Sequence, residues 1–231
     1  MAEIEFRQCP EAVRPPLLWR VLHWPFWIFC RVWLRVSVAG KEHLDPSRGG
    51  LMLINHQSYL DPLIVAVMLP RPVSFLARDN LFRIPILGWI LRTTWVIPIS
   101  REATRSGSIR TAVERLDKGF LVGMFPEGTR SSGTSVKPLR PGFLAVARRT
   151  DQPIYPVGVS GTDRAMPRGA WFIRPFRIQV VYGSPLSNDE REQLRRENDD
   201  SVLCKLLHAR VSDCVMQAEE LRSGGRQGLE T

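Results

Sequence analysis

The chain has 231 residues, of which 44% are hydrophobic and 24% are charged, as in a folded protein of one large domain or two small ones. Its 32 Lys and Arg residues exceed its 23 Asp and Glu residues, which gives a formal net charge of +9. This composition excludes an intrinsically disordered chain. Four cysteines without CxxC or framework spacing exclude a zinc ribbon and a disulfide scaffold, so we expect free thiols.

The positive charge is carried almost wholly by arginine, which supplies 28 of the 32 cations. Arginine presents a planar fork that binds phosphate or carboxylate bidentately, although genomic base composition can also raise its frequency. A basic chain of this kind has three common classes of partner: nucleic acid, a membrane surface or small anionic ligands. The motifs of the predicted elements, taken in chain order, decide between these three classes of partner.

Residues 17–36 form an apolar stretch that contains four of the seven tryptophans. No uncharged run in it reaches the ~18 residues that a spanning helix needs. Helical spacing places its interruptions on one stripe, formed by Arg20, His23, Trp27, Arg31 and Arg35. Aromatic residues on one side and arginines on the other are typical of a helix that lies in the membrane interface. We therefore expect residues 1–38 to form an N-terminal membrane-interface helical segment.

Two alternatives for this segment stay open. A buried amphipathic core helix has the same periodicity. A secretory signal peptide is the other alternative, with Ser37–Ala39 as a cleavage-like site. Signal peptides have a basic start and an uninterrupted apolar middle, whereas here three Glu residues precede the stretch and Arg20 and His23 interrupt it.

The rest of the chain alternates short apolar runs with helical patterns. Strands are expected at 51–54, 73–77, 94–99, 120–125 and 153–159, with one or two more between 171 and 182. Helices are expected from Asp61, over 103–118, over 141–149 and over 189–222, whereas Pro85 and Gly88 interrupt any long helix in the apolar stretch 81–91. Such alternation predicts a single α/β domain over residues 39–222, with a mostly parallel central sheet flanked by helices. Residues 223–231 are expected to form a frayed C-terminal tail.

The first unusual loop follows the strand at 51–54 and reads NHQSYLD. On one helix its His56 and Asp61 would lie about 140° apart around the axis, so they can meet only across a turn. A helix that starts at Asp61-Pro62 allows this turn. A carboxylate bonded to one ring nitrogen makes the other nitrogen a better base. The alternative is a helix-capping Asp61 with an unrelated surface His56.

The second unusual loop follows the strand at 120–125 and reads FPEGTRS from Phe125. Gly128 lets the backbone approach a ligand closely, and Arg130 can bind a phosphate bidentately beside Thr129 and backbone N–H groups. Glu127 can bond a hydroxyl group or orient an arginine. The alternative is an ordinary glycine turn with a surface ion pair.

The two loops together resemble the signature of the glycerolipid acyltransferase family, the PlsC-like lysophosphatidic acid acyltransferases. Residues 96–101 (VIPISR) look like the family's second block, and residues 154–159 (IYPVGV) look like its fourth block. All four blocks occur in the family's order, and the resemblance covers roughly residues 40–185.

The resemblance implies transfer of a fatty acyl group from an acyl thioester, acyl-CoA or acyl-ACP, to the sn-2 hydroxyl of lysophosphatidic acid, which gives phosphatidic acid. His56 would take the proton from the hydroxyl, and Asp61 would orient His56. The implied substrate-binding residues are Arg101, Glu127, Gly128, Thr129 and Arg130. No metal and no cofactor besides the thioester co-substrate is expected.

The expected partners are a lysophospholipid acceptor, acyl-CoA or acyl carrier protein, and membrane lipids, but not nucleic acid. The protein is expected to associate with the cytoplasmic face of the inner (plasma) membrane. Two alternatives stay open: an acyltransferase for another lysolipid, such as a lyso-ornithine lipid, and a non-catalytic lipid-binding module. A serine hydrolase is disfavoured because the G-x-S-x-G motif is absent, and a P-loop enzyme because its glycine-lysine motif is absent.

Overall fold

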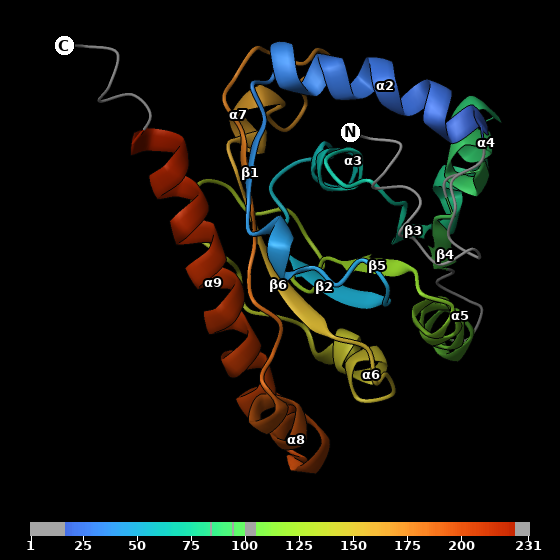
Figure 1. Cartoon of the computed structure of the whole chain (residues 1–231), viewed down its shortest axis with the longest axis vertical. Coiled ribbons are helices and arrows are strands. Elements are labelled where there is room, and N and C mark those ends of the chain that lie inside the picture. Colours follow the sequence, from blue (N-terminus) through green and yellow to red (C-terminus); the bar gives the residue numbers. More distant parts are fainter. Residues whose placement is uncertain (1–16, 84, 94, 100–104, 225–231) are drawn as a thin grey trace.

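The computed structural model describes residues 17–83, 85–93, 95–99 and 105–224 (Figure 1). Its strands are β1 (Ser37–Ala39), β2 (Gly50–Ile54), β3 (Val73–Arg78), β4 (Ile97–Ile99), β5 (Leu121–Met124), β6 (Ile154–Ser160) and β7 (Gln179–Tyr182). Its α-helices are α2 (Leu17–Val32), α3 (Asp61–Val67), α4 (Pro85–Thr93), α5 (Arg105–Asp117), α6 (Leu144–Ala147), α7 (Thr162–Ala165), α8 (Asn188–Arg196) and α9 (Asp200–Gly224). Short 3-10 helices are η2 (Lys41–His43), η3 (Asp79–Arg83) and η4 (Pro141–Phe143).

The strands form one sheet in the order β1-β7-β6-β2-β5-β3-β4. Every pairing is parallel except that of β6 with β7, which is antiparallel. The predicted α/β fold with a mostly parallel sheet is therefore confirmed. Because β6, β2 and β5 are parallel neighbours, the loops that follow them emerge at one edge of the sheet.

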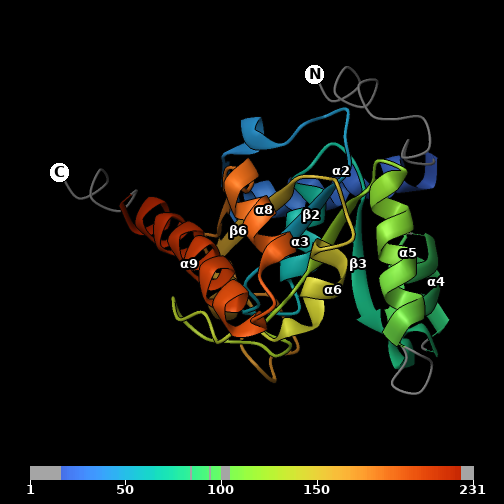
Figure 2. The ribbon, with the colours of Figure 1, turned by 90° about the horizontal axis from the view of Figure 1, so that it is seen from below.

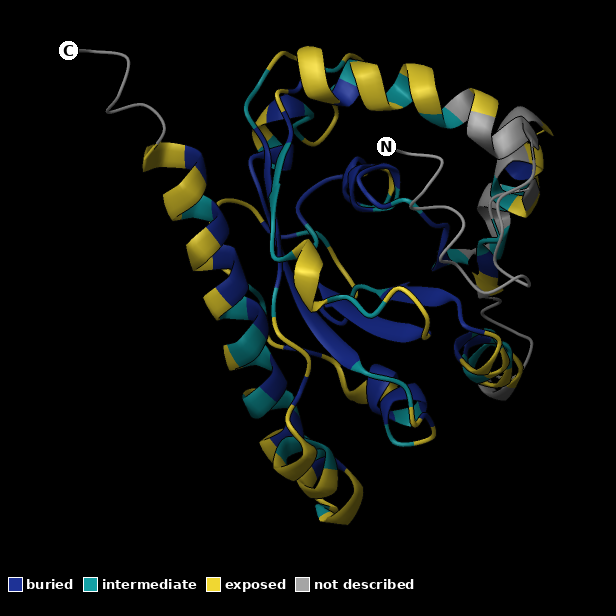
Figure 3. Ribbon diagram, viewed as in Figure 1, coloured by how far each residue is buried: buried dark blue, intermediate teal, exposed yellow. Residues whose placement is uncertain are grey.

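Helices cover both faces of the sheet, which explains why its central strands read as continuous apolar runs. From β2, Met52 and Ile54 pack in one core with α2 and α3, whereas Leu51 and Leu53 pack in a second core with α5, α6 and α9. Figures 1 and 2 show these two helical layers from two directions, and Figure 3 shows the strands buried between them.

Helix α9 packs directly on β6 at a glycine. A Cβ atom on Gly158 would lie 2.3 Å from the backbone carbonyl atoms of Cys214, which is far inside van der Waals contact. The helix backbone therefore approaches β6 more closely than any side chain at this position permits.

Of the predicted stripe, Trp27, Arg31 and Arg35 are exposed, but His23 is not. His23 points toward the domain, where its Nε2–H donates to the carbonyl of Val67 at the end of α3 at 2.8 Å. Burial lowers the pKa of His23 from its ordinary value. The outward face is instead mostly apolar, with Val21, Trp24, Trp27, Ile28 and Val32 exposed. The prediction was wrong for His23, because the last carbonyls of α3 need a donor. The side chain of Arg20 lies outside the described part.

The chain that follows α2 is part of the domain. Cys30, Leu34 and Val36 are buried, and β1 pairs with β7, so the boundary that we expected after residue 38 falls inside a strand. Cleavage after Ala39 would remove this strand together with three buried side chains. Within the described ranges, none of the helices combines the length and apolarity that crossing a bilayer requires.

Other elements can be compared with the expectations. The apolar stretch 81–91 divides between η3 and α4 at Pro85, and the segment 171–182 holds one strand, both within the expectations. The expected helix 189–222 is two helices, α8 and α9, because Arg148 donates to the carbonyls of Leu194 and Glu197 at the end of α8 and pairs with Asp200. Of the expected tail, 223 and 224 belong to α9, and 225–231 lie outside the described residues.

The cysteines that the structure describes, Cys30, Cys204 and Cys214, are free thiols as expected, and Cys9 lies outside the described residues. Burial raises the pKa of Cys30 to about 12 and that of Cys214 to about 11. These thiols are therefore protonated and unreactive at neutral pH.

We predict that Gly158→Ala lowers the free energy of unfolding by about 2–3 kcal/mol, because the added methyl group forces α9 away from β6. The matched control is Gly107→Ala in α5, where a Cβ atom meets nothing within 4 Å; it should raise stability by up to about 1 kcal/mol. Urea denaturation monitored by circular dichroism measures both changes. Equal stabilities of the two variants would contradict the close approach.

Candidate active site

The loops after β2, β5 and β6 meet at one edge of the sheet, as parallel strands require. The first two are the unusual loops of the sequence, which carry His56 and Glu127. The third begins at Gly161 and Thr162. These three loops bring polar side chains from distant parts of the chain into contact around one histidine.

His56 and Asp61 meet across the turn at the start of α3, as the spacing predicted. The distance from His56 Nδ1 to Asp61 Oδ2 is 2.8 Å, and the side chain of Asp61 is 0% exposed while that of His56 is 18% exposed. A carboxylate only accepts hydrogen bonds, so Nδ1 of the neutral ring carries the proton and Nε2 keeps the lone pair. None of the described residues forms a hydrogen bond with Nε2.

The carboxylate of Asp61 is held on both oxygens. Its Oδ2 also accepts the backbone N–H groups of Gln57 at 2.6 Å and of Ser58 at 2.8 Å. Its Oδ1 accepts the hydroxyl of Thr162 at 2.5 Å, and Thr162 is fully buried. Hydrogen bonds to an ionised group are the strong ones. The carboxylate therefore fixes the orientation of the imidazole.

The backbone of His56 is held by the loop that follows β5. Glu127, which is 1% exposed, accepts the His56 N–H on Oε1 at 2.7 Å and the Lys137 N–H on Oε2 at 2.9 Å. Ser131 donates its N–H to the His56 carbonyl at 2.6 Å and its hydroxyl to the same oxygen at 3.1 Å. The ring of Phe125 lies against the imidazole, with centroids 4.3 Å apart. The main chain and the ring of His56 are thus fixed without a ligand.

Glu127 is expected to bind substrate, but the hydrogen bonds of its carboxylate are with backbone amides of the protein. Both of its oxygens face backbone amides, so its contacts are those of a residue that positions His56. A role in substrate binding, as the resemblance implies, stays a prediction.

A cluster of cations gathers around Arg130 in the loop that follows β5. The guanidinium carbon of Arg130 lies 3.9 Å from the ring centre of Tyr59, a cation–π contact that orients the fork. The side chains of Lys137 and Arg168 both donate to the Arg130 carbonyl, Lys137 at 2.7 Å. Three positive side chains from two loops therefore gather around Arg130, one residue before Ser131, which bonds the His56 carbonyl. Such a group suits a phosphate.

The turn between Glu127 and Arg130 is open to solvent. Gly128 has a φ of +66°, and a Cβ atom there would lie 3.0 Å from the side chain of Arg140. Gly128 and Thr129 are both exposed. The glycine permits the left-handed turn and lets the side chain of Arg140 lie over the loop.

The structure brings together His56, Asp61, Glu127, Gly128, Thr129 and Arg130 from the predicted site residues. Arg101 lies outside the described residues. Sequence reasoning did not assign roles to Thr162, Ser131, Lys137 or Arg168. The position of Thr162 directly after a strand at the same sheet edge is the one signal that pointed to it.

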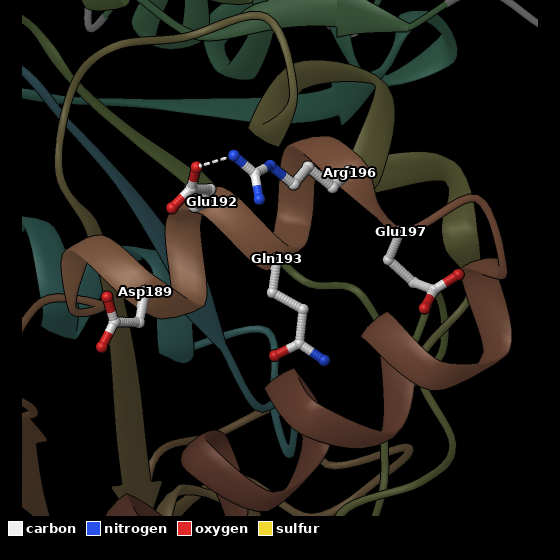
Figure 4. A pocket seen from close by; sticks show the side chains of 5 residues that line it. All are labelled: Asp189, Glu192, Gln193, Arg196 and Glu197. Carbon is white, nitrogen blue, oxygen red and sulfur yellow. Dashed lines mark ion pairs between the residues drawn. The ribbon is translucent and has the colours of Figure 1, made fainter.

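A surface hollow elsewhere is separate from this site. It lies along α8, and Figure 4 shows its lining of charged and amide side chains, with Glu192 and Arg196 paired across one turn. The lining residues are Asp189, Glu192, Gln193, Arg196 and Glu197. None of them belongs to the loops around His56, so the hollow adds nothing to the site.

We predict that Thr162→Val lowers the free energy of unfolding by about 2 kcal/mol, because a buried carboxylate loses a donor without a change in side-chain shape. Thr162→Ser keeps the hydroxyl and is the matched control. Guanidinium denaturation at neutral pH compares them. A valine variant as stable as the serine variant would show that the hydrogen bond to Asp61 does not contribute to the free energy of unfolding.

Comparisons with known proteins agree with this geometry. The sequence profile of the family described as Acyltransferase matches residues 35–160. The chloroplastic 1-acyl-sn-glycerol-3-phosphate acyltransferase BAT2 of Brassica napus is 32% identical over 73% of this chain and 50% of its own length. The 1-acyl-sn-glycerol-3-phosphate acyltransferase of Bacillus subtilis is 25% identical over 80% of this chain and 91% of its own length.

The fold is also similar to a solved one. The crystal structure of the 1-acyl-sn-glycerophosphate (LPA) acyltransferase PlsC from Thermotoga maritima matches with a TM-score of 0.69 and 26% identity, covering 88% of this chain and 79% of that one. The chain spans about half the length of the plant chloroplast relatives that it matches. Because the family profile covers more than half of its residues, including both motif loops around His56, the chain belongs to the Acyltransferase family.

Proposed function

We propose that the protein transfers a fatty acyl group from an acyl thioester to the sn-2 hydroxyl of lysophosphatidic acid, which gives phosphatidic acid. The observation that carries the proposal is the His56–Asp61 pair at 2.8 Å, in which Nδ1 faces the carboxylate and leaves Nε2 for a substrate. A cation cluster around Arg130, in the loop that bonds the backbone of His56, supports it. The names of the matched relatives support the same acceptor.

The chemistry needs one base that later acts as an acid. His56 Nε2 takes the proton of the acceptor hydroxyl as its oxygen attacks the thioester carbonyl. The new C–O bond forms, the C–S bond breaks, and the departing thiolate receives the proton from the imidazolium. Asp61 stabilises the imidazolium in between. A thioester is already activated, so no covalent acyl-enzyme is required, and we propose that no metal or resident cofactor takes part.

The phosphate of the acceptor would be bound by the cation cluster. Arg130 is orientated by Tyr59, and Lys137 and Arg168 add positive charge next to it. Arg101 stays the proposed second arginine from the sequence motif. The exposed turn at Gly128 and Thr129 leaves room for the glycerol backbone.

We propose further that the protein works at the cytoplasmic face of the inner membrane, where acyl-CoA and acyl-ACP are available. The exposed apolar face of α2 supports contact with lipid, because a free helix face bearing Trp24, Trp27 and Ile28 resembles an interfacial helix rather than a solvated one. The acceptor and the product both have long apolar tails and reside in the same leaflet.

We expect His56→Ala to lower turnover by at least about 100-fold, the low end for removal of a general base. The measurement is thiol release from acyl-CoA and from acyl-ACP in the presence of lysophosphatidic acid. The matched control is His43→Ala, since His43 lies before β2 at the opposite sheet edge and bonds the carbonyl of Tyr182. Near-normal turnover in a folded His56→Ala protein would contradict the mechanism.

We expect Arg130→Lys to raise the apparent KM for lysophosphatidic acid about tenfold with little change in kcat, because lysine keeps the charge but loses the fork. Acceptors that lack the phosphate monoester should show no such change. Arg110→Lys, on the exposed face of α5, is the matched control. An equal rise in KM for acceptors with and without the phosphate would contradict a role of Arg130 in phosphate binding.

A further inference from the structure

The segment 166–177, which follows α7, connects the active site to helix α2. At its start, the Met166 carbonyl accepts the hydroxyl of Ser58 at 3.0 Å. Near its end, the Ile173 carbonyl accepts the indole N–H of Trp33 at 3.1 Å. Figure 1 shows α7 beside the C-terminal end of α2. The segment thus forms the surface between the site and the exposed face of α2.

Two aromatic side chains stand out from this segment. Trp171 is 90% exposed and Phe172 is 46% exposed, and their rings meet edge to face with centroids 5.5 Å apart. The guanidinium of Arg174 lies 5.4 Å from the Phe172 ring centre. A tryptophan so fully exposed is uncommon. Trp33, which is also exposed and follows α2, bonds Ile173 of the same segment.

The positive charge of the segment favours an anionic partner at this surface. Residues 164–187 contain no Asp or Glu. They contain Arg164, Arg168, Arg174 and Arg177. Tryptophan flanked by arginines is typical of the boundary between headgroups and acyl chains, and each Arg adds attraction to an anionic leaflet.

We propose that Trp171 and Phe172 insert into the headgroup region of an anionic lipid bilayer and form a second membrane contact beside α2. This inference rests on the proposed function, because it supposes that the protein meets its acceptor in a bilayer. A protein bound to lipid through α2 alone can rotate about the axis of that helix. A second contact at Trp171 and Phe172, joined to the end of α2 by the Trp33–Ile173 hydrogen bond, prevents this rotation. The second contact therefore orients the mouth of the site toward the lipid.

The test is co-sedimentation of the full-length protein with phosphatidylcholine vesicles, with and without phosphatidylglycerol. Trp171→Ala/Phe172→Ala should lower the partition coefficient on anionic vesicles about tenfold, from the lost burial of two aromatic rings. The matched control is Val202→Ala/Met216→Ala, two exposed apolar residues on α9, and it should bind like the wild type. Trp24→Ala/Ile28→Ala tests the contribution of α2 separately.

A second measurement does not depend on the alanine variants. Vesicles with brominated acyl chains should quench part of the wild-type tryptophan fluorescence, and Trp171→Phe should lose a corresponding share of that quenching. Denaturation curves check that each variant is folded.

The proposal is overturned if Trp171→Ala/Phe172→Ala binds vesicles like the wild type, or if the α9 control loses binding equally. It is also overturned if the wild type self-associates in lipid-free sedimentation and this double variant does not, because the surface then covers a second copy of the chain. The vesicle assay contains neither donor nor acceptor. Failure of acyl transfer therefore counts against the proposed function alone, and unchanged vesicle binding counts against the aromatic contact alone.

Discussion

The buried carboxylate of Asp61 is the constraint on which the site depends. An ionised group without solvent is costly unless hydrogen bonds replace its hydration, and Asp61 receives four: two from backbone amides, one from the imidazole and one from Thr162. These donors come from the loops after two neighbouring strands. The carboxylate therefore forces the sheet edge into one arrangement, and the orientation of His56 follows from it.

A second carboxylate performs the complementary task. Asp61 fixes the ring of His56, and Glu127 fixes its main chain, while Ser131 holds the carbonyl on the other side. In the proposed role as a base, an imidazole held from several directions would lose little entropy when it meets substrate. The geometry is consequently preorganised in the free protein, which is the arrangement that efficient proton transfer favours.

Local patterns predicted the parts of the fold that depend on neighbours in sequence. The apolar runs at 51–54 and 120–125 became the central strands β2 and β5, and the helix start at Asp61-Pro62 produced the turn that lets His56 meet the aspartate. The motif loops predicted the family for the same reason, since each motif is a short contiguous segment.

The features that sequence did not predict all depend on tertiary contacts. Glu127 faces an amide 71 residues earlier in the chain, and Thr162 reaches Asp61 from a third loop. The break between α8 and α9 depends on Arg148, and the inward turn of His23 depends on the end of α3. Neither periodicity nor residue type contains such information, because the donor and the acceptor are each ordinary in their own segment.

The hydrogen bond between Trp33 and Ile173 has a consequence for the regiochemistry of the proposed reaction. It ties the end of α2 to the segment that carries Arg168, and Arg168 bonds the Arg130 carbonyl. In the proposed membrane contact, the fold would therefore fix the height of His56 above the bilayer. The carbons of a glycerol backbone anchored by one acyl tail lie at different depths. Under the proposed function, the hydroxyl that reaches Nε2 would then be selected by its depth in the lipid surface, without a pocket that distinguishes one carbon from the next.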